Sequence, residues 1–257
     1  MAAQEHWALV TGGSSGIGLA FSRQLASEGY ALMLVGNRAD ELTEAAKVLP
    51  APAETFCLDL AETGAAERVL AWCDSLGKFP DLLVNDAGMF FMEYLEPANL
   101  GKARTMMRLH VEAVTELSVL FGARMKERGC GQILNISSMT ARIPAPGIAV
   151  YSASKTYVKS FSRSLSYELR PFGVTVTAVC PAAVDTGLYS LGDGLRKFLR
   201  RIGILRSPEW LARRSLKALR RGRRCISPGF TNFLLPPLIA LLPARLIDRL
   251  GLKWIKR

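Results

Sequence analysis

The sequence has 257 residues, of which 49% are hydrophobic, so the chain can bury a substantial core and wholesale disorder is excluded. Its net charge of +11 is unevenly distributed: residues 1–186 hold 16 Lys+Arg against 19 Asp+Glu, and residues 187–257 hold 17 against 3. The basic surplus is therefore local, so no nucleic-acid partner is expected. It indicates either a solvated basic face or attraction of the C-terminal region to something anionic.

Cysteine and histidine usage limits the chemistry further. The five cysteines are scattered, without a Cys-x-x-Cys spacing, and we expect reduced core thiols of an intracellular protein rather than disulfides or metal ligands. With two histidines a zinc site is hard to assemble, so no metal is expected. The N-terminal stretch MAAQEHWALVTGG lacks signal-peptide features, which predicts a cytoplasmic protein.

Short apolar runs alternate with helical periodicity along the chain. The runs are WALVTG, ALMLVG, TFCLDL, DLLVND, QILNIS and VTVTAVCP, and a short last strand is expected near Cys225 and Ile226. Near-continuous apolar strands that alternate with helices predict an α/β fold, a single Rossmann-type domain with a doubly wound parallel sheet.

A glycine-rich turn, TGGSSGIG at residues 11–18, follows the first predicted strand. Gly12, Gly16 and Gly18 permit a tight turn and let backbone N–H groups approach a pyrophosphate at the positive end of the next helix, expected over about 17–28. Such a turn can also serve packing alone. Its place between a strand and a helix favours a dinucleotide site.

The end of the second predicted strand bears on the type of dinucleotide. Folds that select NAD place an acidic side chain here, on the ribose 2′-hydroxyl. This chain has Gly36, Asn37 and Arg38, and its first acidic residue, Asp40, comes later. Because an arginine can pair with a 2′-phosphate, NADP(H) is favoured over NAD(H). The alternative is that Arg38 is merely exposed.

The ordered motifs make residues 6 to about 190 resemble the short-chain dehydrogenase/reductase family. Five family motifs have counterparts in this order: T-G-x-x-x-G-x-G at 11–18, an Asp at Asp59, N-N-A-G as NDAG at 85–88, a Ser at Ser138 about thirteen residues before Y-x-x-x-K at Tyr151 and Lys155, and P-G ahead of a Thr at Pro181 and Thr186. Their joint occurrence is far more specific than any one motif.

The resemblance implies an NAD(P)-dependent oxidoreductase that interconverts a ketone and a secondary alcohol. It implies that Tyr151 donates the proton, Lys155 lowers the tyrosine pKa and holds the nicotinamide ribose, and Ser138 bonds the substrate oxygen. A cation about 4 Å away supplies roughly 4 kcal/mol, enough to lower a pKa near 10 by about 3 units. The implied cofactor contacts are Gly12, Ser14, Ser15, Gly16, Ile17, Gly18, Asn37, Arg38, Asp59, Leu60, Asn85, Ala87, Gly88, Tyr151, Lys155, Pro181 and Thr186.

The chain departs from the family pattern at three positions. The second Asn of N-N-A-G is Asp86, and the Gly of P-G is Ala182. About 28 residues before the catalytic Ser, where many members carry an Asn that links the lysine to solvent through water, stands His110. Because imidazole can relay protons, we expect a catalytic His110 near Lys155, linked directly or through one water. A core histidine is the alternative.

We assign residues 1–190 to the dinucleotide-binding catalytic core and 191–257 to a substrate lid and basic C-terminal region packed on the same domain. The segment after Thr186 mixes apolar and basic residues, which suits a hydrophobic substrate with an anionic end, such as a 3-oxoacyl chain. A solvated lid is the alternative. The alternative to an enzyme is a regulatory or interaction protein that binds the cofactor but turns over substrate weakly.

The C-terminal tail is apolar and contains prolines. FLLPPLIALL, residues 233–242, is too short to span a bilayer, and a break is expected at Pro236 and Pro237. Beyond it, basic residues flank an apolar face formed by Leu246, Leu250 and Trp254. This face fits peripheral contact with an anionic membrane, and equally packing against the domain or a second subunit. The resemblance implies a homodimer or homotetramer.

Overall fold

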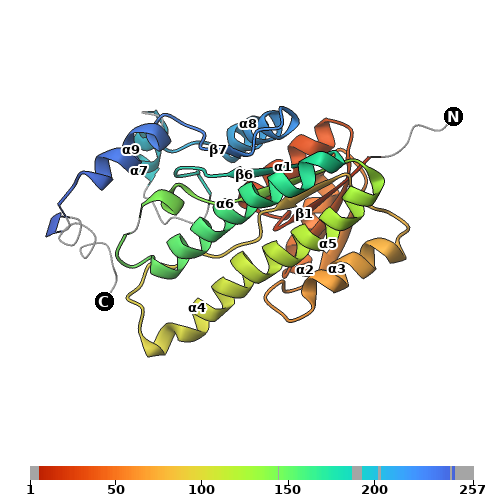
Figure 1. Ribbon diagram of the computed structural model, residues 1–257, viewed down its shortest axis with the longest axis horizontal. Helices are drawn as coiled ribbons and strands as arrows, with labels where there is room; N and C mark the ends of the chain where they lie inside the picture. The colour runs from red at the N-terminus through yellow and green to blue at the C-terminus, as the bar shows by residue number, and fades with distance from the viewer. Residues whose placement is uncertain (1–5, 144, 187–192, 202–203, 244, 247–257) are drawn as a thin grey trace.

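The computed structural model describes residues 6–143, 145–186, 193–201, 204–243 and 245–246. A seven-stranded parallel sheet, in the order β3-β2-β1-β4-β5-β6-β7, is covered by helices (Figure 1). This confirms the predicted single α/β domain, including its short last strand. The strands are β1 Trp7–Thr11, β2 Ala31–Gly36, β3 Ala53–Cys57, β4 Leu82–Asn85, β5 Gly131–Ile136, β6 Val174–Val179 and β7 Cys225–Ile226.

Helices connect the strands and follow them at the C-terminal end. The longer ones are α1 Gly16–Ser27, α2 Ala39–Val48, α3 Ala65–Ser75, α4 Leu100–Met107, α5 Ala113–Arg128, α6 Ala149–Leu169, α7 Asp193–Arg201, α8 Pro208–Arg220 and α9 Thr231–Ala240. Three short 3₁₀ turns are η1 Pro97–Asn99, η3 Met139–Arg142 and η4 Arg170–Phe172. A π-helical turn, η2 Arg108–Glu112, separates α4 from α5, whereas the helical periodicity of TMMRLHVEAVTELSVLF, residues 105–121, predicts a continuous helix.

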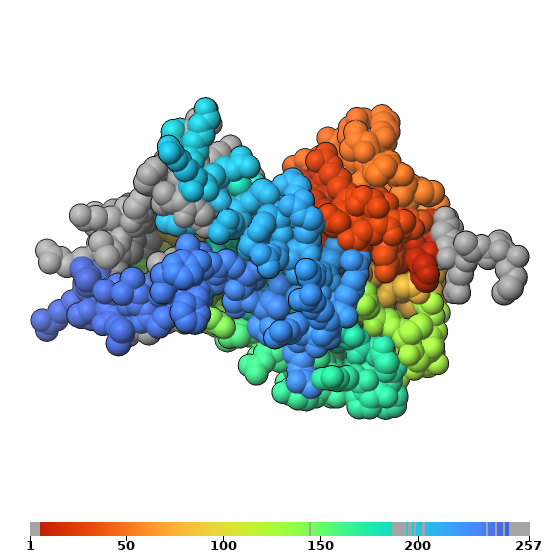
Figure 2. All heavy atoms as spheres, turned by 90° about the horizontal axis from the view of Figure 1, so that it is seen from above, coloured from red at the N-terminus to blue at the C-terminus, as the bar shows by residue number. Residues whose placement is uncertain are grey.

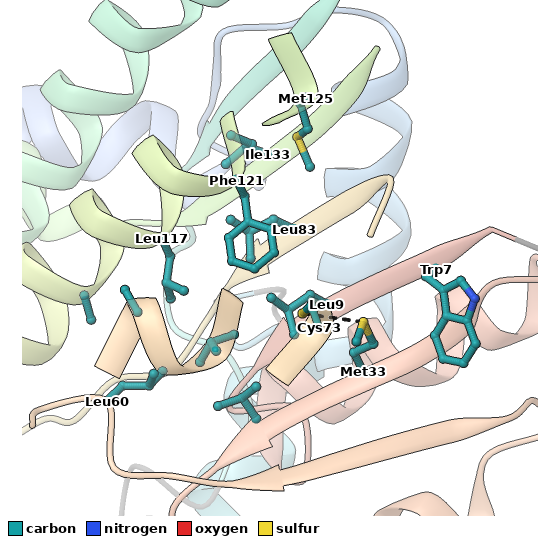
Figure 3. Packing of buried hydrophobic residues seen from close by; sticks show 14 of the residues in the cluster. Trp7, Leu9, Met33, Leu60, Cys73, Leu83, Leu117, Phe121, Met125 and Ile133 are labelled. Atoms are coloured by element: carbon teal, nitrogen blue, oxygen red, sulfur yellow. Dashed lines mark hydrogen bonds between the residues drawn. The ribbon is translucent and has the colours of Figure 1, made fainter. Parts of the chain in front are cut away.

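Two apolar clusters, one on each face of the sheet, explain why the strands are apolar throughout. Successive side chains of a strand point to opposite faces, so Leu9 joins one cluster with α3, α5 and α6, while Val10 joins the other with α1, α2 and α8. Figure 3 shows the first cluster, in which Phe121 of α5 lies beside Leu83 of β4. Burial on both faces leaves polar chemistry to the ends of the strands.

The strand order reverses beside β1, which fixes where a site can form. β1 pairs in parallel with β2 on one side and with β4 on the other. The connection after β1 therefore runs toward one edge of the sheet, and the connection after β4 runs toward the other edge. The connections therefore separate at the carboxyl ends of β1 and β4. A crevice at such a point is where open α/β sheets bind ligands.

Helix α9 runs through both of its prolines, so the expected break is wrong. Pro236 has no N–H for the carbonyl of Asn232, and the Arg142 guanidinium lies 3.5 Å from that oxygen instead. Figure 2 shows the blue C-terminal segment at one end of the molecule. Phe233 and Leu241 of this segment are 74% and 82% exposed. None of the described helices is long and apolar enough to cross a membrane.

The cysteines are only partly the expected core thiols. Cys73 and Cys180 are buried and Cys225 is half-buried, but Cys57 and Cys130 are exposed, because they stand at the end of β3 and just before β5, outside both apolar clusters. All five are free thiols.

Candidate functional site

A cavity of about 540 Å³ opens at the carboxyl ends of the strands, next to the order reversal. It is lined by the glycine-rich turn, the segment after β4, the end of β5, the start of α6 and the segment after β6. The lining residues are Gly12, Ser15, Gly16, Ile17, Arg38, Asp86, Ala87, Gly88, Met89, His110, Ile136, Ser137, Ser138, Tyr151, Lys155, Pro181, Ala182, Val184 and Thr186.

The glycines of the turn are required by the backbone. Gly12 and Gly16 have φ of +67° and +53°, a region that disfavours side chains. A Cβ on Gly18 would lie 2.1 Å from the Gly12 carbonyl oxygen, and one on Gly16 would lie 3.5 Å from the Thr186 methyl group. The chain can therefore bring the N-terminus of α1 to the cavity, where N–H groups and the helix dipole favour an anion.

Tyr151 and Lys155 lie one turn apart on α6 and line the same cavity. The Lys155 ammonium is 5.8 Å from the centroid of the tyrosine ring. It donates to the carbonyl oxygen of Ile136 at 2.9 Å, and the Ser137 hydroxyl donates to the Lys155 carbonyl at 2.6 Å. Ile136, which ends β5, and Ser137, just after it, therefore fix both the ammonium group and the backbone of Lys155.

Ser138 begins the turn that follows β5. Its hydroxyl oxygen accepts the Thr140 N–H at 3.2 Å, so it caps η3, and it lines the cavity with Tyr151. The capping bond uses an oxygen lone pair and leaves the hydroxyl proton for another acceptor. One side chain can serve the turn and the cavity together.

His110 sits in the π turn, buried, between the segment after β4 and α6. Its Nε2 accepts the Met89 N–H at 3.1 Å, so Nδ1 carries the proton of the neutral ring and donates to the Ser154 hydroxyl at 3.0 Å. Burial, helped by the charge of Lys155, holds the pKa of His110 well below its usual value. The structure therefore contains a neutral imidazole.

The hydrogen bonds of His110 bear on the expected relay. Its two ring nitrogens bond Met89 and Ser154, and among the described residues neither bonds Lys155. The Ser154 hydroxyl in turn donates a hydrogen bond to the carbonyl oxygen of Tyr151 at 2.8 Å. A link from His110 to Lys155 through water stays a prediction.

Asp86, noted in the sequence only as a departure, is a half-buried residue whose carboxyl group interacts electrostatically with Lys155. Burial raises its pKa to about 7, although the Lys155 charge and the Gly18 N–H act in the opposite direction. Burial likewise lowers the pKa of Lys155 to about 8, and the Asp86 charge offsets part of that change. Thr11 fixes this segment, since its hydroxyl oxygen accepts the N–H groups of Asp86 and Ala87, both at 3.1 Å.

Most predicted site residues meet at the cavity, but six do not line it: Ser14, Gly18, Asn37, Asp59, Leu60 and Asn85. Asn85 is buried within the sheet, where its amide donates to Asn135 at 2.8 Å and to Ser118 at 3.2 Å. Leu60 belongs to an apolar cluster, and the Asp59 carboxylate accepts the N–H of Ala61 at 2.9 Å. Of these three residues, Asn85 links the ends of β4 and β5, while Asp59 and Leu60 make local and apolar contacts outside the cavity lining.

Six lining residues were absent from the predicted set: Asp86, Met89, Ile136, Ser137, Ala182 and Val184. Asp86 and Ala182 stand inside recognisable motifs, so the motifs themselves could have identified them. Ile136 and Ser137 directly precede Ser138 and could have been inferred from it. Met89 and Val184 carry no sequence signal of a site.

Comparison with known proteins gives the family. The family model described as short chain dehydrogenase matches residues 6–191. The chain belongs to the short-chain dehydrogenase family. It is therefore an oxidoreductase of a family that uses NAD(P)(H). The cavity fits such a dinucleotide, because two positive-φ glycines and the N-terminus of α1 form a cradle that a side chain would fill.

Curated relatives of this short-chain dehydrogenase include reductases of different substrates. The human very-long-chain 3-oxoacyl-CoA reductase is 32% identical over 72% of this chain and 61% of its own length. Sulfoacetaldehyde reductase 2 of Chromohalobacter salexigens is 31% identical over 69% of this chain and 72% of its own. A Streptomyces avermitilis short-chain dehydrogenase structure, 26% identical, covers 98% of both chains with a TM-score of 0.80.

We predict that Asp86→Asn lowers the pKa of Lys155 below about 8, because the neutral amide removes the negative charge that raises it. The ammonium is lost as pH rises through its pKa, so the variant loses it at lower pH. Titration of the Lys155 Cε resonance by NMR measures this. Asp74→Asn, at an exposed ion pair with Arg124, is the control. An unchanged or higher pKa in Asp86→Asn would contradict the coupling.

Proposed function

We propose that the protein is an NADP(H)-dependent oxidoreductase that interconverts a ketone and a secondary alcohol on a hydrophobic, 3-oxoacyl-like substrate. One observation carries the proposal: Ser138, Tyr151 and Lys155 line the same cavity as the glycine cradle. A dinucleotide on that cradle supplies or takes up a hydride. The side chains of this chain then have to handle the matching proton.

The roles of the three side chains follow from their positions. Tyr151 gives its phenolic proton to the substrate oxygen during reduction and takes it back during oxidation. Lys155, 5.8 Å from the tyrosine ring, stabilises the phenolate electrostatically. With a pKa of about 8 it is mainly an ammonium at neutral pH. Ser138 donates its hydroxyl proton to the substrate oxygen and orients it.

The NADP(H) preference rests on Arg38. This residue lines the cavity just beyond β2, where the chain has no acidic side chain until Asp40. Its side chain is 59% exposed, and its guanidinium pairs with Glu41 at 2.5 Å. A 2′-phosphate would share the planar guanidinium with that carboxylate, which suits the several donors of arginine.

The acyl-like substrate is supported by the apolar and basic residues after Thr186 and by the relatives named as 3-oxoacyl-CoA reductases. Much of the predicted lid, residues 187–192 and 202–203, lies outside the described residues. So do residues 247–257, with Leu250 and Trp254 of the predicted membrane face. Contact with a membrane, assembly into a dimer or tetramer, and a cytoplasmic location stay predictions.

The alternative is a cofactor-binding regulatory protein with weak turnover. The departures at Asp86, His110 and Ala182 motivate it, and the intact Ser138, Tyr151 and Lys155 speak against it. Assays with NADPH and 3-oxoacyl, steroid, sugar and quinone carbonyls separate the two. Binding of NADPH without turnover of any carbonyl class would favour the alternative.

We predict that Tyr151→Phe lowers turnover of the best carbonyl in that screen by at least about 10²-fold, because the ring remains and only the transferable proton is lost. NADPH binding, followed by fluorescence, should be nearly unchanged. Tyr157→Phe is the control, since Tyr157 lies on the same helix with its hydroxyl bonded to Thr115. Equal losses of binding and rate in Tyr151→Phe would point to a structural tyrosine.

We predict that Arg38→Ala weakens NADPH binding about tenfold or more and changes NADH binding little, because only NADPH carries the 2′-phosphate that the guanidinium would bond. Fluorescence titration with each nucleotide measures the ratio. Arg23→Ala, at an exposed position of α1, is the matched control. If Arg38→Ala binds both nucleotides as before, Arg38 does not select the cofactor.

For His110 we propose a positioning role, because both ring nitrogens hold neighbouring segments. His110→Asn can keep one acceptor and one donor, so most activity should remain, whereas His110→Ala should lose roughly 10- to 100-fold. The pH profile separates the roles: a relay through water requires the acidic limb to change in the alanine variant, and positioning leaves its midpoint in place. An alanine variant as fast as the parent would exclude both.

A further inference from the structure

A pair of thiols lies at the sheet edge beside the candidate site. Cys180 directly follows β6, and Cys225 begins the edge strand β7, whose backbone pairs with β6. The two sulfur atoms are 3.9 Å apart, so the thiol of one can donate to the sulfur of the other. Cys180 is buried and Cys225 is half-buried, so among the two only Cys225 can meet a reagent from solvent.

Basic side chains from two elements act electrostatically on this pair. Lys159 and Arg163 of α6 and Arg142 of η3 all act electrostatically on Cys225. The hydrogen bond from Cys180, followed by these cations, lowers the pKa of Cys225 to about 6 against the opposing effect of burial. The pKa of Cys180 moves up, because it keeps the proton that it donates. A half-buried cysteine under the influence of several cations is the environment of a reactive thiolate.

We propose that Cys225 is a modification site that reacts with small anionic disulfides, with Cys180 as the hydrogen-bond donor to its thiolate. The Cys225 thiolate attacks one sulfur of the disulfide, a new S–S bond forms, and the other half leaves as a thiolate. No further oxidant is needed, because the reagent disulfide is reduced by the same electron pair. The cations at 142, 159 and 163 attract the negative groups of the reagent.

The position of Cys180 connects such a modification to the candidate site. The carbonyl of Val179, just before it, accepts the Ser137 N–H at 2.7 Å, and the carbonyl of Pro181, just after it, accepts the Met139 N–H at 2.8 Å. These two bonds bracket Ser138. A group attached to Cys225 presses on Cys180, and so on the strand end that holds Ser138.

Ellman's reagent, a dianionic aromatic disulfide, tests the proposal at pH 6. Cys57 and Cys130 are the matched controls, because they are exposed free thiols outside both apolar clusters. At this pH about half of a thiol with a pKa near 6 is thiolate, against well under 1% of an ordinary one. A thiolate of lower pKa is also a weaker nucleophile, which offsets part of this difference in thiolate fraction. Cys225 should therefore react roughly tenfold faster than the controls.

Variants separate the contributions to this rate. In a Cys57→Ser and Cys130→Ser background, Cys225→Ser should remove the fast phase, and Cys180→Ala or Lys159→Met should slow it several-fold at pH 6. In the protein that retains Cys57, the ratio of the Cys225 rate to the Cys57 rate should be smaller with cystamine, a cationic disulfide, than with Ellman's reagent. Thermal melting confirms that each variant is folded.

Two outcomes would overturn the proposal: a Cys225 rate no greater than that of Cys57 and Cys130 at pH 6, or a ratio of the Cys225 rate to the Cys57 rate that is no larger for Ellman's reagent than for cystamine. Neither outcome depends on the cofactor or the substrate, so the test is independent of the proposed catalytic function.

Discussion

The buried ammonium of Lys155 imposes the main constraint on the site. An unpaired ammonium inside a protein costs several kcal/mol, so its surroundings have to supply an oxygen atom and a negative charge. The Ile136 carbonyl supplies the first and Asp86 the second. Because Ile136 ends β5 and Asp86 follows β4, both strand ends must stand at fixed positions against α6. That arrangement also places Ser138, two residues after Ile136, opposite Tyr151.

The segment that carries Asp86 is held by the first βα unit. Thr11, the last residue of β1, receives two N–H groups of that segment, while the glycines behind it bring the start of α1 to the same cavity. The two sides of the strand-order reversal are thus joined by hydrogen bonds at the point where the ligand site forms. The position of Asp86, and with it the negative charge that acts on Lys155, is therefore tied to the end of β1.

The sheet and the motif residues were predictable because they depend on local sequence. Apolar runs must be buried wherever they lie, and the glycine spacing permits few backbones. The π turn was not predictable, since its residues show ordinary helical periodicity. The role of Asn85 was also hidden, because its partners Ser118 and Asn135 come from other elements. Likewise, the carbonyl of Asn232 that Pro236 leaves without a helical N–H is met by Arg142, which is far away in the sequence.

The π turn at Arg108–Glu112 also restricts how the length of this segment can vary. Each residue of an α-helix advances the chain by about 100° around its axis. A π turn takes up one residue more than an α-helical turn, so α4 and α5 stay nearly in phase across it, whereas a further inserted residue would rotate one against the other by about that angle. Removing the extra residue would restore a regular helix but would change the backbone position from which His110 bonds Met89 and Ser154. Within the turn, the exposed Arg108 and Glu112 are open to substitution, whereas the buried His110 is not. A single-residue insertion or deletion displaces either a flanking helix or His110, even where it would make the helix more regular.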